Sequence, residues 1–236
     1  MTVNTKLETE QQDEYYLDTP VIRDFVGAVR QVLAEHAEVE TRLAALQPRF
    51  TALLADQSWL TEEFAAANPQ GGMGDGIGSW LLFRAADRSL TLISLVVPSG
   101  SETHVHDHLA WGFVGIYRGE QSETVYRRLD QAGHNHAHHE PEQDHNHSHS
   151  PDYAHLEVAQ VNQLKPGDNY TLIPPEGDIH SVKTTSRQAS ISIHMLANDI
   201  GCVMRHVFEP DKDRVRAYRS GYSNVDCPDL PGDNKA

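Results

Sequence analysis

The sequence has few of the features that mark several common protein classes. It contains only 2 cysteines in 236 residues, Cys202 and Cys227, too few for a disulfide framework and consistent with a reducing cytosol. No run of about 18 apolar residues occurs, which excludes a membrane-spanning helix of ordinary length. The N-terminal stretch is acidic and polar, the opposite of a secretory signal. We therefore expect a cytoplasmic protein.

Positive charge is also scarce. Lys and Arg number 19 against 34 Asp and Glu, which gives a formal net charge of -15. Such a surface repels phosphate backbones and anionic lipid, so we expect neither a nucleic-acid nor a membrane partner. Hydrophobic residues make up 39%, enough for a core, and the length suits one domain with a helical attachment.

The apolar spacing early in the chain predicts helices. Hydrophobic residues recur there at three- and four-residue intervals, which is the period of an amphipathic helix. Because proline disrupts a helix interior, we expect a break at Pro48, with helices over 21–46 and 49–56 and a third near 58–66.

The chain then changes character. We place a flexible acidic N-terminus at 1–19 and the helical segment at 20–67, followed by a glycine-rich stretch. From about residue 75 to 230, short β-rich runs bounded by Gly, Pro or charged turns follow one another, beginning with a probable hairpin in SWLLFRAADRSLTLISLVVP. This texture predicts a β-sandwich or β-barrel.

Histidine is unusually abundant, with 15 residues, and most are clustered. We expect an inserted loop at about 130–157, low in apolar content, that binds extra divalent metals or serves only to solubilise the chain. Its histidines are His134, His136, His138, His139, His145, His147, His149 and His155.

A second cluster, HVHDH at 104–108, has the spacing of metal ligands. Side chains alternate across a strand, so His104, His106 and His108 can project to one face. A third ligand must come from elsewhere in the fold, and His180, at the end of PEGDIH, offers it; His194, in SISIHML, is a fourth inward-pointing candidate.

The frame around these histidines resembles the cupin superfamily. Gly100, His106, His108 and Gly119 follow the first cupin motif, except that Gly112 stands where most cupins place a glutamate ligand.

Pro175, Gly177 and His180 resemble the second cupin motif. The resemblance implies a mainly β fold, a double-stranded β-helix (jelly-roll) barrel preceded by a short N-terminal helical segment. A neutral three-histidine site suits Fe(II), and it also suits zinc.

Several further segments are similar to the thiol dioxygenases, and to the 3-mercaptopropionate dioxygenase or bacterial cysteine dioxygenase type more than to the mammalian enzyme. They are HDHLAWGFVGIYRGE, GDIHSV, SISIHM, NDIGCVMRHVF and SGYSN. The similarity covers about 75–230.

This resemblance implies Fe(II) bound by His106, His108 and His180, with His104 outside the triad. It implies a hydrogen-bonded relay beside the iron that begins with Ser192 and His194 and ends, in the family, with a tyrosine.

Here Leu196 stands in the place of that tyrosine, and Gly112 stands where the mammalian enzyme has its crosslinking cysteine. Arg205 matches the arginine that holds the substrate carboxylate; Leu196 and Trp111 are further candidates for substrate binding. A hydroxyl group from another strand can replace the lost one, and the candidates are Tyr117, Tyr170 and Tyr222.

The implied activity is oxidation of a small carboxylate-bearing thiol, similar to 3-mercaptopropionate or cysteine, to its sulfinate with O2. Two alternatives stay open at this point. One is a three-histidine cupin oxygenase that cleaves carbon–carbon bonds of a non-thiol substrate. The other is a metal-handling protein that depends on residues 134–149.

Overall fold

The computed structural model describes residues 12–70, 73–130 and 152–228, whose strands form two antiparallel sheets. The first sheet contains, in spatial order, β1 (Glu14–Tyr15), β2 (Gly78–Arg84), β3 (Thr91–Val97), β10 (Ser190–Leu196), β5 (Gly112–Arg118) and β8 (Asn169–Leu172). The second contains β12 (Arg214–Tyr218), β11 (Arg205–Glu209), β4 (Val105–His106), β9 (Ile179–Thr184), β6 (Gln121–Arg128) and β7 (Leu156–Leu164).

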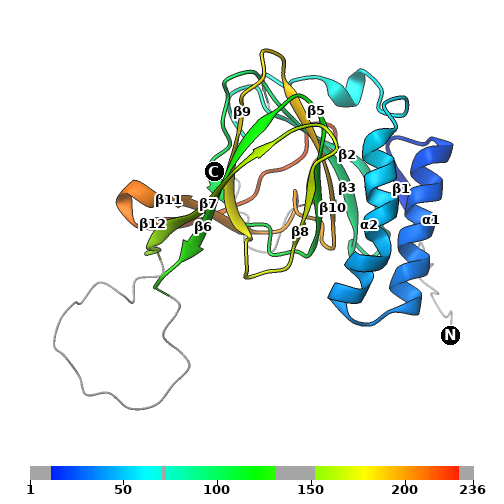
Figure 1. Ribbon diagram of the computed structural model, residues 1–236, viewed down its shortest axis with the longest axis horizontal. Coiled ribbons are helices and arrows are strands. Elements are labelled where there is room, and N and C mark those ends of the chain that lie inside the picture. The colour runs from blue at the N-terminus through cyan, green and yellow to red at the C-terminus, as the bar shows by residue number, and fades with distance from the viewer. Residues whose placement is uncertain (1–11, 71–72, 131–151, 229–236) are drawn as a thin grey trace, which may run out of the picture.

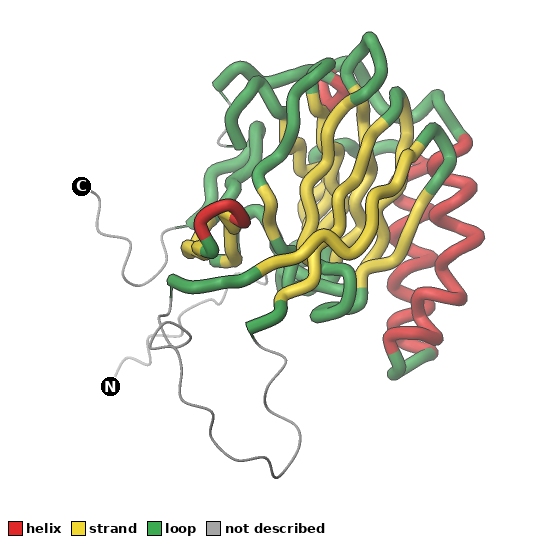
Figure 2. Tube along the Cα trace, turned by 60° about the vertical axis from the view of Figure 1, so that its left-hand side comes forward, coloured by secondary structure: helices red, strands yellow, loops and turns green. Residues whose placement is uncertain are grey.

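From β3 to β11 the chain crosses repeatedly between the two sheets, apart from the β6–β7 pair, and the sheets face each other as a barrel (Figure 1). The predicted double-stranded β-helix fold is confirmed, and so is the expected hairpin, since β2 pairs with β3. Helices α1 (Pro20–Glu35) and α2 (Val39–Ala55) lie against one side of the barrel, while the β11–β12 hairpin projects on the other (Figure 2).

The helices cover the outer face of the first sheet. α1 buries Ile22, Phe25, Val26 and Val29, spaced by three and four residues as one face of a helix requires. The ring of Phe50 in α2 stacks on Phe113 of β5, with centroids 5.0 Å apart. The helical segment thus packs on the barrel through a continuous apolar layer.

The predicted helix boundaries are wrong. α2 runs through Pro48, and the break falls earlier, where His36 and Glu38 have extended backbone. Burial outweighs the hydrogen bond that proline removes, because the apolar stripe of α2 continues on both sides of Pro48. In place of a helix near 58–66 there is a single 3-10 turn at Glu63–Ala65.

The two faces of strand β10 carry different kinds of side chain. Ile191, Ile193 and Met195 point outward into the layer beneath the helices. The alternate residues Ser192, His194 and Leu196 therefore point into the barrel.

Two other sequence-based expectations change. Glu14 and Tyr15, placed in the flexible N-terminus, form a strand paired with β2. Cys202 and Cys227, interpreted as cysteines of a reducing compartment, are joined in a disulfide, the state more typical of oxidising compartments. A cytoplasmic location stays a prediction.

The His-rich insertion expected at about 130–157 lies, for the most part, outside the described residues, between β6 and β7. Among the helices within the described ranges, none combines the length and apolar character needed to cross a membrane.

Candidate metal centre

Three histidines meet inside the barrel. His106 of β4 is the direct cross-strand partner of His180 in β9, and His108 follows two residues after His106. One ring nitrogen from each of the three lies within 4.8 Å of the others, and all three residues are buried. The structure thus brings together the three ligands that the sequence predicts.

The second ring nitrogen of each histidine fixes which atom faces the centre. The Nδ1 atoms lie 2.9 Å from the His104 carbonyl oxygen for His106, 3.1 Å from Asp178 Oδ1 for His108, and 2.7 Å from Glu123 Oε1 for His180. Carbonyl and carboxylate oxygens accept, so each Nδ1–H donates and each Nε2 keeps its lone pair.

Those lone pairs fit a metal ion. The Nε2 atoms of His108 and His180 are buried and have no hydrogen-bond partner among the described groups. A buried polar atom without a partner is costly, and a cation bound between the three rings would satisfy them. Carboxylate partners behind metal-binding histidines orient the rings and raise their basicity.

Burial keeps the imidazoles of His106 and His108 neutral. Desolvation holds the pKa of His106 and of His108 well below the ordinary histidine value, and the nearby His180 and Arg205 lower both further. Glu123 is buried, which opposes ionisation, but its hydrogen bond with His180 lowers the pKa of the carboxyl group. Two neutral imidazoles and a carboxylate with a lowered pKa behind His180 suit a divalent cation.

His194 lies beside the triad on β10. Its ring centroid is 6.2 Å from that of His108, and its Nε2 is 3.0 Å from the Ser192 hydroxyl oxygen. Burial lowers the pKa of His194 to about 3, so the ring is neutral. The two residues that the resemblance places at the start of the relay are in hydrogen-bond contact.

Leu196 is fully buried on the same face of β10. It belongs to an apolar cluster with Ile93 and Ile200, both of which line the cavity next to the histidines. Its cross-strand partner is Gly112, where a Cβ atom would lie 2.0 Å from the Met195 carbonyl oxygen. Only glycine fits at 112 in this close contact between strands.

Among the described residues, no hydrogen bond joins the three candidate tyrosines to His194, although Tyr170 and Tyr222 pack against the apolar cluster of Leu196. Tyr117 packs against Trp59 beneath the helices, with ring centroids 5.2 Å apart. The Tyr170 hydroxyl is 3.4 Å from His180 Nδ1, behind that ligand, and the Tyr222 hydroxyl donates to Asp199 Oδ1 at 2.7 Å.

Arg205, at the start of β11, is buried with 2% exposure. Its guanidinium group donates to the Ile200 carbonyl oxygen at 3.0 Å, the Asp107 carbonyl oxygen at 2.6 Å and the Ser220 hydroxyl at 2.9 Å. All three acceptors are uncharged. Within the described ranges no carboxylate contacts the guanidinium group of Arg205, although Asp107 and Asp178 favour its charge through space.

A small cavity of about 20 Å³ joins these groups. Its lining residues are Met73, Ser79, Ile93, Leu95, His106, His108, His194, Ile200, Arg205 and Ser220. Two histidines of the triad, His194 and the buried Arg205 cation thus share one small space. Trp111 packs instead on the helix side, where the guanidinium carbon of Arg42 lies 5.8 Å from its ring centroid.

Three residues at the site were missed in the sequence. Asp178 stands two positions before His180, and this proximity is a weak signal that it supports a ligand. Glu123 and Ser220 reach the site only through strand register and chain reversal, which local patterns do not encode.

No protein-family model matches the chain. Solved structures with partial similarity include the cupin domain of Schizosaccharomyces pombe Cnp3, at 16% identity over 56% of this chain and 68% of that chain, with a TM-score of 0.35. An uncharacterized conserved protein with a double-stranded β-helix domain from Klebsiella pneumoniae matches at 13% identity over 58% and 86%, with a TM-score of 0.36.

The oxalate decarboxylase of Lactobacillus farciminis matches at 12% identity over 48% of this chain and only 25% of that chain, with a TM-score of 0.32. Scores this low add nothing to the argument, so the assignment rests on the chain's own sheets and side chains. The two sheets fit the cupin fold, and the three histidines inside it form a cluster that could hold a metal ion.

Proposed function

We propose that this protein is a non-haem Fe(II) dioxygenase that oxidises a small carboxylate-bearing thiol to its sulfinate with O2. The observation that carries the proposal is the shared cavity. A three-histidine metal site and a buried arginine without a carboxylate partner among the described residues open onto the same space.

Arg205 selects the charge of the substrate. A buried guanidinium group hydrogen-bonded only to neutral oxygens binds a carboxylate strongly, because the planar fork of donors matches the two carboxylate oxygens. Met73, Ile93 and Leu95 supply an apolar wall, which favours a substrate with a short hydrocarbon chain.

The cavity also disfavours a positively charged substituent. Its lining residues include no aspartate or glutamate, so an α-ammonium group would meet the Arg205 cation without an anion beside it. This favours a simple mercapto-acid such as 3-mercaptopropionate over cysteine.

His106, His108 and His180 would hold the iron, which supplies the redox and Lewis-acid chemistry needed to activate O2 and the thiol sulfur. The protein's own contribution is positioning. Arg205 fixes the carboxylate end of the substrate, and the closed cavity limits water. The neutral His194, in contact with the Ser192 hydroxyl, can accept or donate a proton beside the triad.

The test is oxygen consumption by the full-length protein loaded anaerobically with one equivalent of Fe(II). Expected is uptake with 3-mercaptopropionate, slower uptake with cysteine, and a product heavier by two oxygen atoms. The His180→Ala variant retains the histidines of 134–149 and is therefore the control for iron bound elsewhere. Uptake that survives in this variant, or no uptake with any thiol, would overturn the proposal.

Burial of Leu196 favours one second candidate. Where the resemblance implies a hydroxyl group, the site has apolar bulk, which suits a three-histidine oxygenase cleaving a carbon–carbon bond of an enolisable diketone. Carboxylic-acid fragments from a diketone, without sulfinate from thiols, would support it. Metal handling through 134–149 concerns residues outside those described and stays a prediction.

A further inference from the structure

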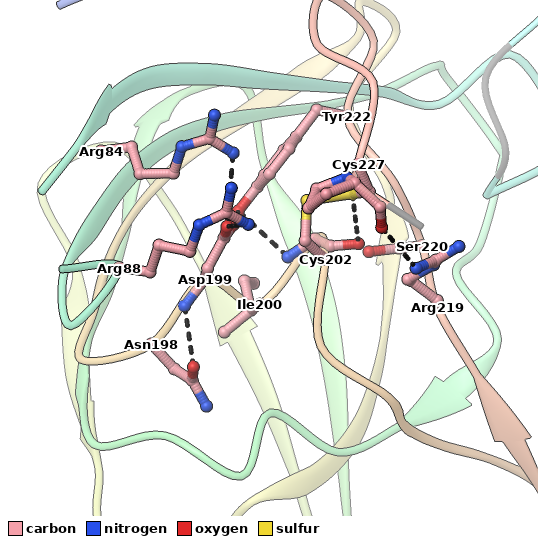
Figure 3. The surroundings of a disulfide bond; sticks show 12 residues. Arg84, Arg88, Asn198, Asp199, Ile200, Cys202, Arg219, Ser220, Tyr222 and Cys227 are labelled. Carbon is pink, nitrogen blue, oxygen red and sulfur yellow. Dashed lines mark hydrogen bonds and ion pairs between the residues drawn. A yellow bond between two sulfur atoms is a disulfide. The ribbon is translucent and has the colours of Figure 1, made fainter. Parts of the chain in front are cut away.

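The C-terminal segment from Ser220 to Cys227 folds back against the turn at 198–203 that precedes β11 (Figure 3). The Cys202–Cys227 disulfide joins the two across a sequence separation of 25 residues. Cys202 is buried with 4% exposure, whereas Cys227 is half-buried and within reach of a small reductant.

Hydrogen bonds define how the segment docks on the turn. The Tyr222 hydroxyl donates to Asp199 Oδ1 at 2.7 Å and accepts from the Gly201 amide at 3.0 Å. The Gly221 amide donates to the Gly201 carbonyl oxygen at 2.9 Å. A Cβ atom at Gly201 would lie 2.4 Å from the Tyr222 ring, so the ring rests directly on the turn.

The same two segments hold Arg205. The turn provides the Ile200 carbonyl oxygen that accepts from Arg205 Nε, and the C-terminal segment provides the Ser220 hydroxyl that accepts from Nη2. Ile200 and Ser220 also line the cavity. The disulfide therefore links two walls of the pocket in which the guanidinium group sits.

We propose that the Cys202–Cys227 disulfide is a redox-sensitive clasp that positions Arg205 for carboxylate binding. Reduction by a dithiol transfers two electrons and two protons, which breaks the S–S bond, forms two cysteine thiols and closes the dithiol into its own disulfide. The C-terminal segment then opens more often, because losing the crosslink restores its chain entropy. Arg205 loses Ser220, and substrate affinity falls while the metal ligands stay in place.

Detecting the clasp by kinetics rests on the proposed function. With 3-mercaptopropionate, reduction by dithiothreitol should raise KM about fivefold and leave kcat within about twofold, since the lost contact acts on binding rather than on chemistry. The Cys202→Ser/Cys227→Ser variant should show the same raised KM without reductant. Dithiothreitol should not change the variant, which separates the clasp from effects of the reductant on iron. Mass spectrometry after each assay reports the state of the disulfide, because the substrate is itself a thiol.

Hydrogen exchange tests the clasp without any activity. Reduction of the wild-type protein should accelerate exchange of the Gly201 and Gly221 amides, which bond across the two segments, and leave the β10 amides unchanged. The clasp would be overturned by unchanged exchange at both glycines, or by a KM that is the same in the oxidised and the reduced protein. No thiol oxidation in the oxidised wild-type protein would overturn only the proposed function. Reduced wild type provides the measurement if the double variant does not fold.

Discussion

Two arginines are buried in this barrel in opposite ways. Arg84 of β2 forms ion pairs with Glu14 at 2.5 Å and Asp199 at 3.3 Å. Burial opposes its charge, but these carboxylates raise the pKa of the guanidinium group above its usual value. Arg205 hydrogen-bonds only to uncharged oxygens, and burial lowers its pKa.

The difference in partners suggests different roles, a structural one for Arg84 and a ligand-binding one for Arg205. A buried cation is strongly unfavourable unless an anion compensates it, and the chain supplies anions at Arg84. At Arg205, beside the three histidines, no carboxylate of the described residues is in contact, although Asp107 and Asp178 favour its charge through space. This charge faces the cavity, which is the arrangement expected where a ligand provides the contacting anion.

The largest expected effect follows from removing that cation. Arg205→Met should lower kcat/KM for a mercapto-acid by about 10²–10³, because losing one partner of a buried charge pair costs about 2–5 kcal/mol. Arg205→Lys keeps the charge without the planar fork and should recover part of the loss. Steady-state kinetics on iron-loaded protein measure both. An unchanged KM in Arg205→Met would mean that the substrate carboxylate binds elsewhere.

Removing the other cation should affect folding instead. Arg84→Met leaves Asp199 with the half-exposed Arg88 and the Tyr222 hydroxyl, and we expect the free energy of unfolding to fall by about 3 kcal/mol. KM should stay within about threefold, since Arg84 does not line the cavity. Urea denaturation and kinetics on the same preparation give both numbers. A KM as high as that of Arg205→Met would erase the distinction between the two arginines.

The metal ligands were accessible to sequence reasoning, because H-x-H in a strand and a histidine after a Pro-x-Gly turn are local patterns. The barrel was also predictable from its short, regularly bounded strands. Only the family resemblance singled out Arg205. Without the resemblance, nothing in the sequence indicates that an arginine near the C-terminus is buried.

The remaining features depend on tertiary packing. Glu123 reaches His180 because Val125 is the cross-strand partner of His180, a register that no short window reveals. The disulfide joins residues whose proximity depends on chain reversal after β12. The helix continues through Pro48 because burial of its apolar face outweighs the low helix propensity of proline. Propensity alone contains no information about that burial.

The two regions should also differ in their response to acid. In the metal-free protein, burial lowers the pKa of His106, His108 and His194. As the pH falls below 6.5, these histidines therefore bind protons in the unfolded state before they do so in the folded state. The free energy of unfolding decreases from that pH downward. At the other arginine, the Arg84 hydrogen bond lowers the pKa of Glu14 below 4.5, so that ion pair is lost only in stronger acid.

Melting temperatures of the metal-free protein between pH 7.5 and 5 test this order. In His194→Gln, the free energy of unfolding should decline less steeply with falling pH, by about 1.4 kcal/mol per pH unit, which is the contribution of one titrating group. The exposed His104 provides the matched control, and His104→Gln should leave the decline unchanged. A decline as steep in His194→Gln as in wild type would show that the cavity does not account for the acid sensitivity.

The smallest expected effect concerns one of the neutral oxygens around Arg205. Ser220→Ala removes the acceptor for Nη2 while Ile200 and Asp107 still hold the guanidinium group, so KM should rise only about fivefold, roughly the value of one hydrogen bond. The effect should be weaker still in the Cys202→Ser/Cys227→Ser background, because the open segment has already withdrawn Ser220. If the two changes instead multiply, Ser220 and the disulfide act on the cavity independently, and Ser220 still holds the Arg205 guanidinium group when the disulfide is absent.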